Sequence, residues 1–364
     1  MSNNRKSPLV SIIIVNFNGS RYIRRCLNSV SNTDYPNFEV ILVDNNSNDG
    51  SLEMIYNLFG EDRRLRIYPL KENIGFAAAN NIGVSKAKGE YIAFLNPDTL
   101  VEKNWLTELM KAAMVHGEFG ALQPLLKKMG SELLDGAGDF PTVHGISFIF
   151  AHCVRNSANI YPKEIFSARA AAMLIRKSVF KEIGGFDPDY FIGYEDVDLG
   201  WRIQLRGMKS FLVPNSVVEH IGRASTKTVS DLESFHKHKN CMMTIIKNFN
   251  LKNLIIRLPA TFTLRFLLSV SPFQITRDLT KNGFSAIKAL LYIIINLPKI
   301  WRKRLVVQTF IRKVQDDEVF EKMLPACFWV DLLRWFLIYK RKTNFWDYLF
   351  GAMYRYIQVS RYSE

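Results

Sequence analysis

Apolar runs alternate with stretches of helical spacing over the first hundred residues of the chain. Residues 8–15 and 38–43 are nearly continuous apolar runs, which are typical of buried strands. Between them Ile23, Leu27 and Val30 recur at the spacing of one helix face. This order predicts a strand–helix–strand unit with two parallel strands.

The same alternation continues as far as residue 98. We expect a helix at 51–59, a strand at 65–68, a helix at 77–87 and a strand at 91–95. Strands that alternate with helices indicate an α/β domain with a mostly parallel sheet. Such sheets bind ligands at the carboxyl ends of their strands.

The periodicity is less regular after residue 100. We expect helices at 103–115, 177–183 and 195–205, and strands at 170–175, 211–213 and 217–218. Residues 120–150 lack a clear period and are expected to form loops and short strands. The predicted organisation is a catalytic domain over residues 1–245, followed by a mainly helical, basic region over residues 246–364.

Positive charge is concentrated in the last third of the chain. The formal net charge is +14; residues 1–240 carry 28 Lys and Arg against 26 Asp and Glu, whereas residues 241–364 carry 20 against 8. The basic residues flank apolar runs such as 289–297 and 335–339. This mixture favours an anionic membrane surface over nucleic acid as partner. The alternatives are a solvated basic face and helices that pack on the catalytic domain.

The apolar windows of this region are interrupted. Residues 254–271 and 284–301 both contain basic residues and a proline, whereas a spanning helix needs about 20 apolar residues. We therefore expect peripheral attachment. The early apolar run at 10–15 is too short for a signal peptide, so we expect a cytoplasmic protein on the inner face of the cell membrane.

Polar side chains follow three of the predicted strands. Asn16 and Asn18 come after the first, Asp44 and Asn46 after the second, and the Asn-Pro-Asp sequence of residues 96–98 after the fourth. Because these ends meet at one edge of a parallel sheet, they predict a site for a polar ligand. A carboxylate there is a hard oxygen ligand suited to Mg²⁺. Asn-rich turns and helix caps are the alternative.

Three carboxylates, Glu195, Asp196 and Asp198, crowd the predicted start of a helix. Their mutual repulsion must be offset, and Arg202 stands four residues after Asp198 to do so. A carboxylate held ionised in such a place would suit a general base. Helix capping is the alternative role.

Histidines occur in two settings. His220 closes the second of the late apolar strands and is either a structural residue or a metal ligand. His236 and His238 alternate with lysines, which predicts a solvated basic helix face.

Taken together, these segments resemble the inverting glycosyltransferases of family 2, and most of all bacterial rhamnosyltransferases. The resemblance covers residues 8–245 and implies the GT-A fold, a Rossmann-like nucleotide-diphospho-sugar transferase domain. It rests on five segments in the family's order: SIIIVNFNG (11–19), VDNNSNDG (43–50), NIGFAAANNIG (73–83), FLNPDT (94–99), and GGFD (184–187) followed by YEDVDL (194–199).

The resemblance implies a nucleotide-sugar site at the strand ends. Asp44 would hold the base, and Asn80 stands where many relatives carry Arg, whose reach to a diphosphate it lacks. Asn96 replaces the first acid of the family's Asp-x-Asp motif. The residues implied to contact the nucleotide sugar are Val15, Asn16, Asn18, Asp44, Asn46, Gly75, Asn80, Asn96, Pro97 and Asp98.

It also implies the catalytic groups. Asp98 and His220 would hold a divalent metal, Mg²⁺ or Mn²⁺. Asp196 would act as base, taking the proton of an acceptor hydroxyl as its oxygen attacks the anomeric carbon in line, with inversion. The acceptor site is implied to contain Glu195, with Trp201 and Arg202 as supporting residues.

The Asn-Pro-Asp form and the basic apolar tail resemble rhamnosyltransferases that build polysaccharide on lipid carriers. This implies dTDP-L-rhamnose as donor and a lipid-linked or polysaccharide acceptor. UDP-galactofuranose, UDP-glucose and UDP-N-acetylglucosamine are alternatives, because the sugar pocket is expected in the poorly patterned residues 136–145. A catalytically silent nucleotide-sugar-binding scaffold is an alternative of another class, against which the joint presence of Asp98, Glu195, Asp196 and His220 argues.

Overall fold

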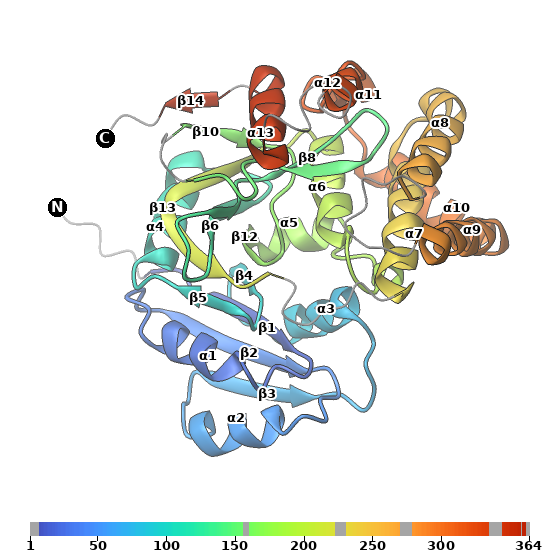
Figure 1. Cartoon of the computed structure of the whole chain (residues 1–364). Helices are drawn as coiled ribbons and strands as arrows, with labels where there is room; N and C mark the ends of the chain where they lie inside the picture. Colours follow the sequence, from blue (N-terminus) through green and yellow to red (C-terminus); the bar gives the residue numbers. More distant parts are fainter. Residues whose placement is uncertain are drawn as a thin grey trace.

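The computed structural model describes residues 7–155, 160–222, 231–269, 279–334, 344–357 and 359–361. A ten-stranded sheet lies at its centre, with helices on both faces (Figure 1). The main strand order is β11-β13-β6-β12-β4-β1-β2-β3, while β5 pairs with β13 and β7 with β6. The α/β class predicted from the sequence is confirmed.

The first four strands form a parallel unit, as the pattern predicts. They are β1 (Val10–Asn16), β2 (Phe38–Asp44), β3 (Leu65–Pro69) and β4 (Tyr91–Leu95). Their connecting helices are α1 (Ile23–Ser31), α2 (Ser51–Phe59) and α3 (Phe76–Lys86). Ile13 of β1 is in register with Ile41 on one side and Phe94 on the other. The carboxyl ends of these strands therefore meet at one edge of the sheet.

The second half of the sheet is mixed in direction. Its strands are β5 (Thr99–Val101), β6 (Leu122–Lys128), β7 (Leu134–Gly136), β11 (Glu164–Ile165), β12 (Ala172–Arg176) and β13 (Ser210–His220). β12 runs antiparallel to β4, with Met173 opposite Phe94, whereas β13 is parallel to β6. The prediction of a mostly parallel sheet is wrong here, because pairing with a strand far earlier in the chain sets the direction of β12.

The two short strands predicted before His220 are one strand, β13. Its register with β6 shifts between Val213 and Val217, a bulge that bends the strand and explains the broken apolar pattern. The stretch expected to hold loops and short strands forms β6, β7 and a hairpin of β8 (Asp139–Pro141) and β9 (Ser147–Ile149). A further pair joins β10 (Ile160–Pro162) to β14 (Val359–Arg361).

Helices cover both faces of the sheet. Those from the middle of the chain are α4 (Trp105–His116), α5 (Lys177–Glu182) and α6 (Glu195–Leu205). Alternate residues of β1 belong to separate cores: Ile12 and Ile14 pack with Trp105, and Ile13 belongs to the core that contains Trp201. This follows from the two-residue period of a strand. The ends of the strands, rather than their faces, are thus available to a ligand.

The C-terminal region is mainly helical, as predicted. It contains α7 (Asp231–Asn248), α8 (Leu251–Ser269), α9 (Leu279–Ile295), α10 (Leu297–Val306), the π-helical turn η2 (Val307–Ile311), α11 (Asp316–Phe320), α12 (Phe328–Arg334) and α13 (Phe345–Tyr356). In Figure 1, α8, α9 and α10 form the outer flank beside α7, and α11, α12 and α13 lie along the top of the molecule.

The helical region packs on the sheet domain through α7. Ile245, Ile246 and Phe249 belong to the same core as Trp201. Packing of these helices on the catalytic domain, one of the alternatives for the basic region, is therefore observed. The boundary predicted at residue 245 falls within α7, and a division of the chain into two units there stays a prediction.

Two histidines of α7 are buried, although the sequence predicts a solvated face for them. His236 stacks on Phe191, and both His236 and His238 have less than a tenth of their surface exposed. Burial lowers the pKa of His236 to about 4 and that of His238 to about 3, so both rings are neutral at pH 7. The alternation of His and Lys failed as a signal because α9 packs along this helix.

None of the described helices is by itself long and apolar enough to cross a membrane. Two consecutive segments, Phe284–Ile295 and Leu297–Ile311, reach that length and composition only when taken together, and they meet at an angle of 70°.

Candidate active site

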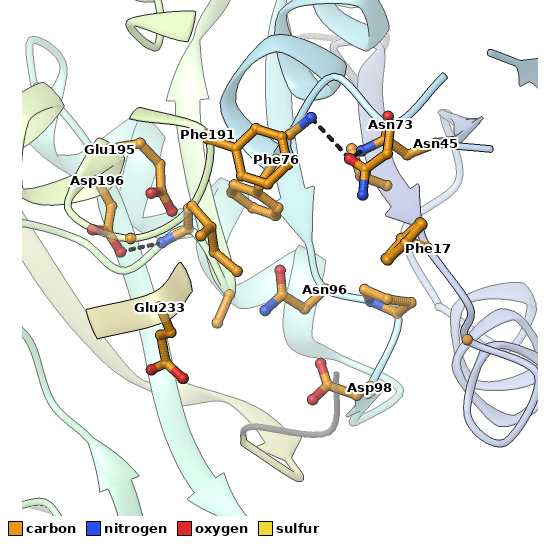
Figure 2. Close-up of a pocket in the computed structure, with 18 of the residues that line it drawn as sticks. Phe17, Asn45, Asn73, Phe76, Asn96, Asp98, Phe191, Glu195, Asp196 and Glu233 are labelled. Atoms are coloured by element: carbon orange, nitrogen blue, oxygen red, sulfur yellow. Dashed lines mark hydrogen bonds between the residues drawn. The ribbon is translucent and has the colours of Figure 1, made fainter. Parts of the chain in front are cut away.

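A cavity of about 580 Å³ opens at the carboxyl ends of β1 and β4, beside the end of β13 and the start of α7 (Figure 2). Most of the residues expected from the sequence line it: Val15, Asn18, Gly75, Asn96, Pro97, Asp98, Glu195, Asp196 and His220. Segments more than 200 residues apart in the chain thus meet at one place. Its size lies within the range of small-ligand pockets, roughly 300–1,000 Å³.

Asp98 and His220 form a pair at the floor of this cavity. Nε2 of His220 lies 3.3 Å from Oδ1 of Asp98, and both side chains are largely buried. Asp98 comes from the loop between β4 and β5, and His220 is the last residue of β13, which pairs with β5. The short strand β5 therefore brings the two residues together.

Asp135, on β7, holds the other side of the His220 ring. Its Oδ2 atom accepts a hydrogen bond from Nδ1 of His220 at 2.8 Å and another from Nη1 of Arg169 at 2.6 Å. Although burial opposes it, the Arg169 charge and the His220 contact hold the pKa of Asp135 below its usual range. Burial likewise opposes charge on His220, but its contacts with Asp135 and Asp98 raise its pKa to about 9.

The chemistry of these side chains fits a divalent metal. A carboxylate oxygen and an imidazole nitrogen face each other. The amide of Asn96 lies beside them, with Nδ2 at 3.5 Å from Nε2 of His220 and with Oδ1 buried and without a hydrogen-bond partner among the described residues. Within the described ranges, no group of three or more His, Cys, Asp or Glu side chains is placed to hold an ion. An ion at Asp98 and His220 would thus need oxygen atoms from a ligand, as Mg²⁺ commonly takes from phosphates.

Asp196 points into the cavity from the start of α6, on another side from Asp98 (Figure 2). Its Oδ1 accepts a hydrogen bond from the N–H of Val197 at 2.8 Å, and its Oδ2 from that of Ala170 at 3.3 Å. Burial raises the pKa of Asp196 above its ordinary value, and the Arg169 guanidinium partly offsets this. A carboxylate with a raised pKa accepts a proton more readily, as a general base must.

Glu195 lies beside Asp196 and is also in the cavity wall. It is 7% exposed, and its Oε2 atom has no hydrogen-bond partner in the part of the chain that the structure describes. Burial first, and the neighbouring Asp196 charge second, raise the pKa of Glu195. A carboxyl group kept neutral in this way can donate a hydrogen bond to a ligand oxygen.

Besides Asp135, two charged residues near the site were not predicted from the sequence. Arg169 lines the cavity between Asp135 and Asp196, and Asp139 is a buried carboxyl group. Burial raises the pKa of Asp139, with the Arg169 charge opposing it. Arg169 stands alone within an apolar stretch, and such a charge inside a buried run was the signal that could have found it.

The residues expected to hold the base are tied to one another. Nδ2 of Asn16 donates to Oδ1 of Asp44 at 2.8 Å, and Ser47 donates to Asp44 through both its hydroxyl group and its backbone N–H. Asp44 is 1% exposed and is absent from the cavity wall. In this structure Asp44 shapes the turn after β2, which is the turn role left open by the sequence, and its contact with a base stays a prediction.

Two other expected contacts also lie outside the cavity wall. Asn46 is exposed, with a positive φ of 65° in the same turn. Asn80 is buried, and its Nδ2 atom donates to the carbonyl oxygen of Phe76 one turn earlier in α3. The short amide of Asn80 hydrogen-bonds within its own helix at this position, so Asn80 has a structural role in α3 here.

Neighbours of those residues line the cavity instead. Nδ2 of Asn45 donates to Oδ1 of Asn73 at 2.8 Å, and the same oxygen accepts from the N–H of Gly75 at 3.0 Å. Figure 2 shows Phe17 on the same side of the cavity and Phe191 above it. Aromatic rings beside amide groups suit a flat polar ring system such as a nucleobase. The sequence contained these residues, but nothing in its pattern separated Asn45 from Asp44.

Trp201 and Arg202 are buried in α6 and do not line the cavity. Trp201 packs edge-on against Phe166 and Phe249. Arg202 forms an ion pair with Asp198, 2.7 Å between Nη2 and Oδ2, which confirms the expected pairing. Both residues support α6. Of the three residues implied for the acceptor site, Glu195 lines the cavity and the other two do not.

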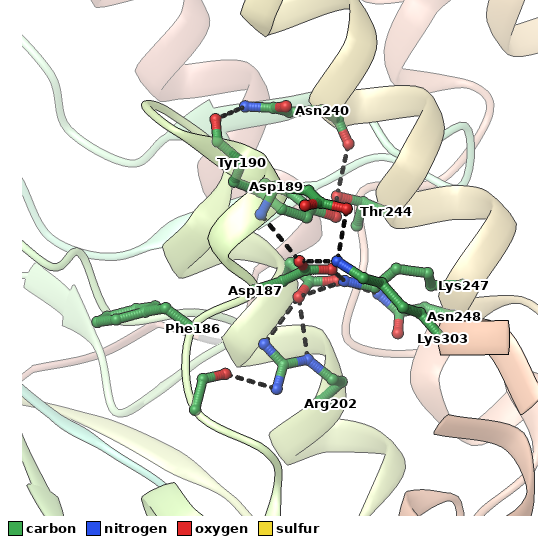
Figure 3. A network of polar contacts seen from close by, with 12 residues as sticks. Phe186, Asp187, Asp189, Tyr190, Arg202, Asn240, Thr244, Lys247, Asn248 and Lys303 are labelled. Atoms are coloured by element: carbon green, nitrogen blue, oxygen red, sulfur yellow. Dashed lines mark hydrogen bonds and ion pairs between the residues drawn. The ribbon is translucent and has the colours of Figure 1, made fainter. Parts of the chain in front are cut away.

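A buried ionic network ties the loop before α6 to the basic C-terminal helices (Figure 3). Nζ of Lys247, on α7, lies 2.7 Å from Oδ2 of Asp187 and 3.0 Å from Oδ2 of Asp198. Lys303, on α10, forms ion pairs with Asp187 and with Asp189. Part of the basic excess of the C-terminal region is thus consumed inside the protein.

The loop held by this network carries cavity residues. Phe191, Ile192 and Gly193 line the cavity and lead into α6. Phe191 has a positive φ of 54°, a conformation that costs about 1–3 kcal/mol in a non-glycine residue. Nδ2 of Asn240, on α7, donates to the carbonyl oxygens of Ile192 and Gly193 at 2.9 and 2.6 Å. Contacts from α7 therefore fix the segment that presents Glu195 and Asp196.

Residues 136–145, where the sugar pocket is expected, do not line the cavity. Val143 donates its N–H to the carbonyl oxygen of Leu324, and Gly145 lies against Ile245 of α7. This hairpin packs against the C-terminal helices, and its contact with a donor sugar stays a prediction.

Comparison with known proteins agrees with this geometry. A family model described as Glycosyl transferase family 2 matches residues 11–184. An uncharacterized glycosyltransferase of Haemophilus influenzae is 36% identical over 31% of this chain and 47% of its own length. The poly-beta-1,6-N-acetyl-D-glucosamine synthase of Staphylococcus epidermidis is 26% identical over 54% of this chain and 46% of its own length. The chain thus spans about half the length of these relatives.

Among solved structures, GalNAc-T7 with UDP, GalNAc and Mn²⁺ is similar with a TM-score of 0.57 and 19% identity, over 81% of this chain and 58% of that one. This likeness concerns the fold, which is GT-A. The order of the motifs, the family match and the fold agree. Residues 11–184 therefore match the family 2 glycosyltransferase model within a GT-A fold.

Proposed function

We propose that this protein transfers a sugar from a nucleotide-sugar donor to a polysaccharide or lipid-linked acceptor in bacterial cell-surface glycan synthesis, with inversion at the anomeric carbon. The observation that carries this proposal is the single cavity wall shared by Asp196, which has a raised pKa, and by the Asp98–His220 pair. One group is suited to accept a proton, and the other pair to hold a charged diphosphate end.

The reaction requires one proton acceptor and one leaving group. A carboxylate oxygen of Asp196 takes the proton of the acceptor hydroxyl. At the same time the hydroxyl oxygen of the acceptor bonds to the anomeric carbon. The bond between that carbon and the diphosphate oxygen breaks on the opposite side, and the nucleoside diphosphate leaves with both electrons. The product is the inverted glycoside, and no covalent bond to the protein forms.

Asp98 and His220 are the side chains that would hold a divalent ion, Mg²⁺ or Mn²⁺, and the Nδ2 atom of Asn96 lies 3.5 Å from Nε2 of His220. Such an ion, when bound, neutralises charge on a leaving diphosphate. Asp135 fixes the orientation of His220 through Nδ1 and leaves Nε2 facing Asp98. Asn96 provides one negative charge fewer than an aspartate would at the same place. The affinity of the site for an ion would therefore depend more strongly on His220.

For the donor we propose dTDP-L-rhamnose, supported by the Asn-Pro-Asp form of residues 96–98 and the basic apolar tail. UDP-galactofuranose, UDP-glucose and UDP-N-acetylglucosamine belong in the same test panel. For the acceptor, the support is a relative named poly-beta-1,6-N-acetyl-D-glucosamine synthase. We place the protein on the inner face of the cell membrane, supported by the charge and apolar content of its C-terminal helices.

The test is a transfer assay with the full chain, Mn²⁺ and each donor, supplied with a lipid-linked acceptor fraction. We expect one donor to give a glycoside whose anomeric configuration, read by NMR, is opposite to that of the donor. Asp196→Asn serves as the matched inactive control. Retention of configuration would overturn the proposed displacement. Binding of donors without transfer or hydrolysis across the whole panel would instead favour the scaffold.

A further inference from the structure

The outer faces of α9 and α10 expose apolar side chains, which is unusual for a helix on a protein surface. Exposed positions of α9 recur at the three- and four-residue spacing of one helix face, and most of them are apolar. On α10 and η2 the exposed apolar residues include Trp301 and Phe310. In the part of α9 whose side chains the structure describes, residues 284–295, the exposed apolar residues are Phe284, Ile287, Leu291, Ile294 and Ile295.

The inner face of α9 is apolar as well. Ala286, Ala289 and Ile293 are buried, and the helix packs along α7. A helix that is apolar on both faces is normally covered on both sides. Contiguous exposed apolar surface of this kind marks an interaction or membrane site.

The basic residues around this exposed apolar face indicate an anionic partner. Residues 251–311 carry ten Lys and Arg against one acidic residue; among the ten, Lys299 and Lys303 pair with carboxylates of the loop before α6, and Arg304 is buried. Lys288 is exposed on the same face as Ile287 and Leu291, and Arg302 is exposed beside Trp301. Basic residues that border an apolar helix face are typical of helices that lie in the interface of an anionic bilayer.

A second copy of the chain fits this surface less well. In a two-fold dimer the same patch meets itself, so the basic residues Lys288 and Arg302 would face a surface that carries the same positive charges. Like charges held close together across an apolar contact oppose association. An anionic lipid surface provides both an apolar interior and the opposite charge.

We propose that the outer faces of α9 and α10 form a docking surface for anionic lipid, with both helices lying along the membrane rather than crossing it. The bend of 70° between them lets two short helices follow one plane in different directions. α9 is 17 residues long, about 25 Å, and this length lies along the surface.

The position of this surface suggests how a lipid-linked acceptor would reach the cavity, an inference that rests on the proposed function. α7 packs against α9 on one side, and its first turns contribute Leu232 and Lys237 to the cavity wall (Figure 1). One helix thus separates the proposed docking surface from the cavity. A sugar acceptor anchored in the bilayer would approach the cavity along the side of α7.

The test is sedimentation of the full chain with vesicles, one set of phosphatidylcholine alone and one of equal parts phosphatidylcholine and phosphatidylglycerol. We expect the wild type to sediment with the anionic set, and Ile287→Asp with Leu291→Asp to lower its partition coefficient at least tenfold. Lys288→Glu with Arg302→Glu should also weaken binding. Tyr56→Asp with Leu58→Asp on α2, an equally exposed apolar pair, is the matched control and should bind as the wild type does.

Three outcomes would overturn the docking surface. One is equal vesicle binding by the wild type and the Ile287/Leu291 variant. Another is a wild-type dimer in solution that this variant dissolves, without vesicle binding, which would assign the face to a second copy. The third is resistance of the bound protein to extraction by alkaline carbonate, which would indicate insertion. Donor hydrolysis in solution, measured on the same variants, reports separately on the proposed transfer reaction and should be unchanged.

Discussion

Asp135 accepts a hydrogen bond from Nδ1 of His220 at 2.8 Å, so that Nε2 of the same ring faces Asp98 at 3.3 Å. A carboxylate behind a histidine is the arrangement that orients metal-binding imidazoles and fixes which nitrogen carries the proton. Asp135, which is 4% exposed on β7, would therefore act on a bound metal ion through His220, without contacting the ion itself.

Asp135→Asn should weaken Mn²⁺ binding about 10- to 100-fold, because the amide holds the ring less firmly and removes a negative charge behind it. Titration calorimetry with Mn²⁺ in the presence of a nucleoside diphosphate measures this. Asp62→Asn, on a surface carboxylate that pairs with Arg64, is the control and should bind normally. Unchanged Mn²⁺ affinity in the Asp135 variant would show that this residue does not orient a metal ligand.

Asp196→Asn should lower kcat by about 10²- to 10⁴-fold, because an amide cannot take the acceptor proton. Donor binding should stay near that of the wild type, since the Asp98–His220 pair lies on another side of the cavity. Glu195→Gln, the neighbouring change, should cost less, because a neutral amide can still donate a hydrogen bond. Steady-state transfer rates and donor affinities of the two variants separate these roles, and normal turnover of the Asp196 variant would remove it as base.

Arg169→Met should move the acidic limb of the pH–rate profile to higher pH. Arg169 lowers the pKa of Asp196 against the effect of burial, so its removal leaves Asp196 protonated, and inactive as a base, over a wider range. Activity is lost as the pH falls through this pKa. The profile of kcat/KM against pH shows the shift directly.

Lys209→Met is the control for this profile, because Lys209 pairs with Glu164 on the surface and lies outside the cavity wall. Its acidic limb should match that of the wild type. A limb that stays in place in the Arg169 variant would mean that another group controls it.

Lys247→Met should destabilise the protein by about 3–5 kcal/mol, because it leaves Asp187 and Asp198 as buried charges short of one partner. Lys299→Met removes a pair with Asp189 whose lysine is 55% exposed, and should cost at most about 1 kcal/mol. Urea unfolding of both variants gives the two free energies of unfolding. Equal losses would contradict the view that the buried network of Figure 3, rather than surface charge, anchors the C-terminal helices.

Gly75→Ala should lower kcat/KM up to about 100-fold through misplacement of the cavity wall. Gly75 has a φ of +85°, and a Cβ atom there would lie 2.5 Å from Cδ2 and 2.8 Å from Cα of Phe191. Gly50→Ala is the matched control, because Gly50 has a φ of +78° but nothing within 4 Å of its Cβ position. Both changes strain the backbone, so a loss of activity confined to Gly75 would trace to Phe191. Similar rates for both variants would refute that role.

The parallel part of the sheet could be predicted because its signals are local. β1 and β2 are mainly apolar, and the helix that joins them, α1, shows a clean helical period. The direction of β12 and the single long strand β13 could not be predicted. Their pairing partners lie far away in the chain, and the bulge between Val213 and Val217 broke the only local pattern.

The same division applies to the site. Asp98, Glu195, Asp196 and His220 could be found because each follows an apolar strand or opens a helix. Asp135 escaped notice because its neighbourhood in sequence is ordinary. Arg169 stands alone in an apolar stretch, but its role was not evident there, because both residues become part of the site only when β7 and the segment before β12 meet.

The sequence by itself determined the class of the domain, the edge of the sheet that carries the site, and the carboxylates at the cavity wall. Helical and strand periodicity, and the positions of strand ends, depend on residues within about ten or twenty positions of one another. The local sequence pattern is therefore enough to predict them. Only the tertiary structure decided that Asp135 stands behind His220 and that Lys247 and Lys303 are buried against Asp187. Partners of a buried charge are chosen by the packing of distant segments, because an unpaired charge cannot remain in the interior and must find whichever opposite charge the fold brings near.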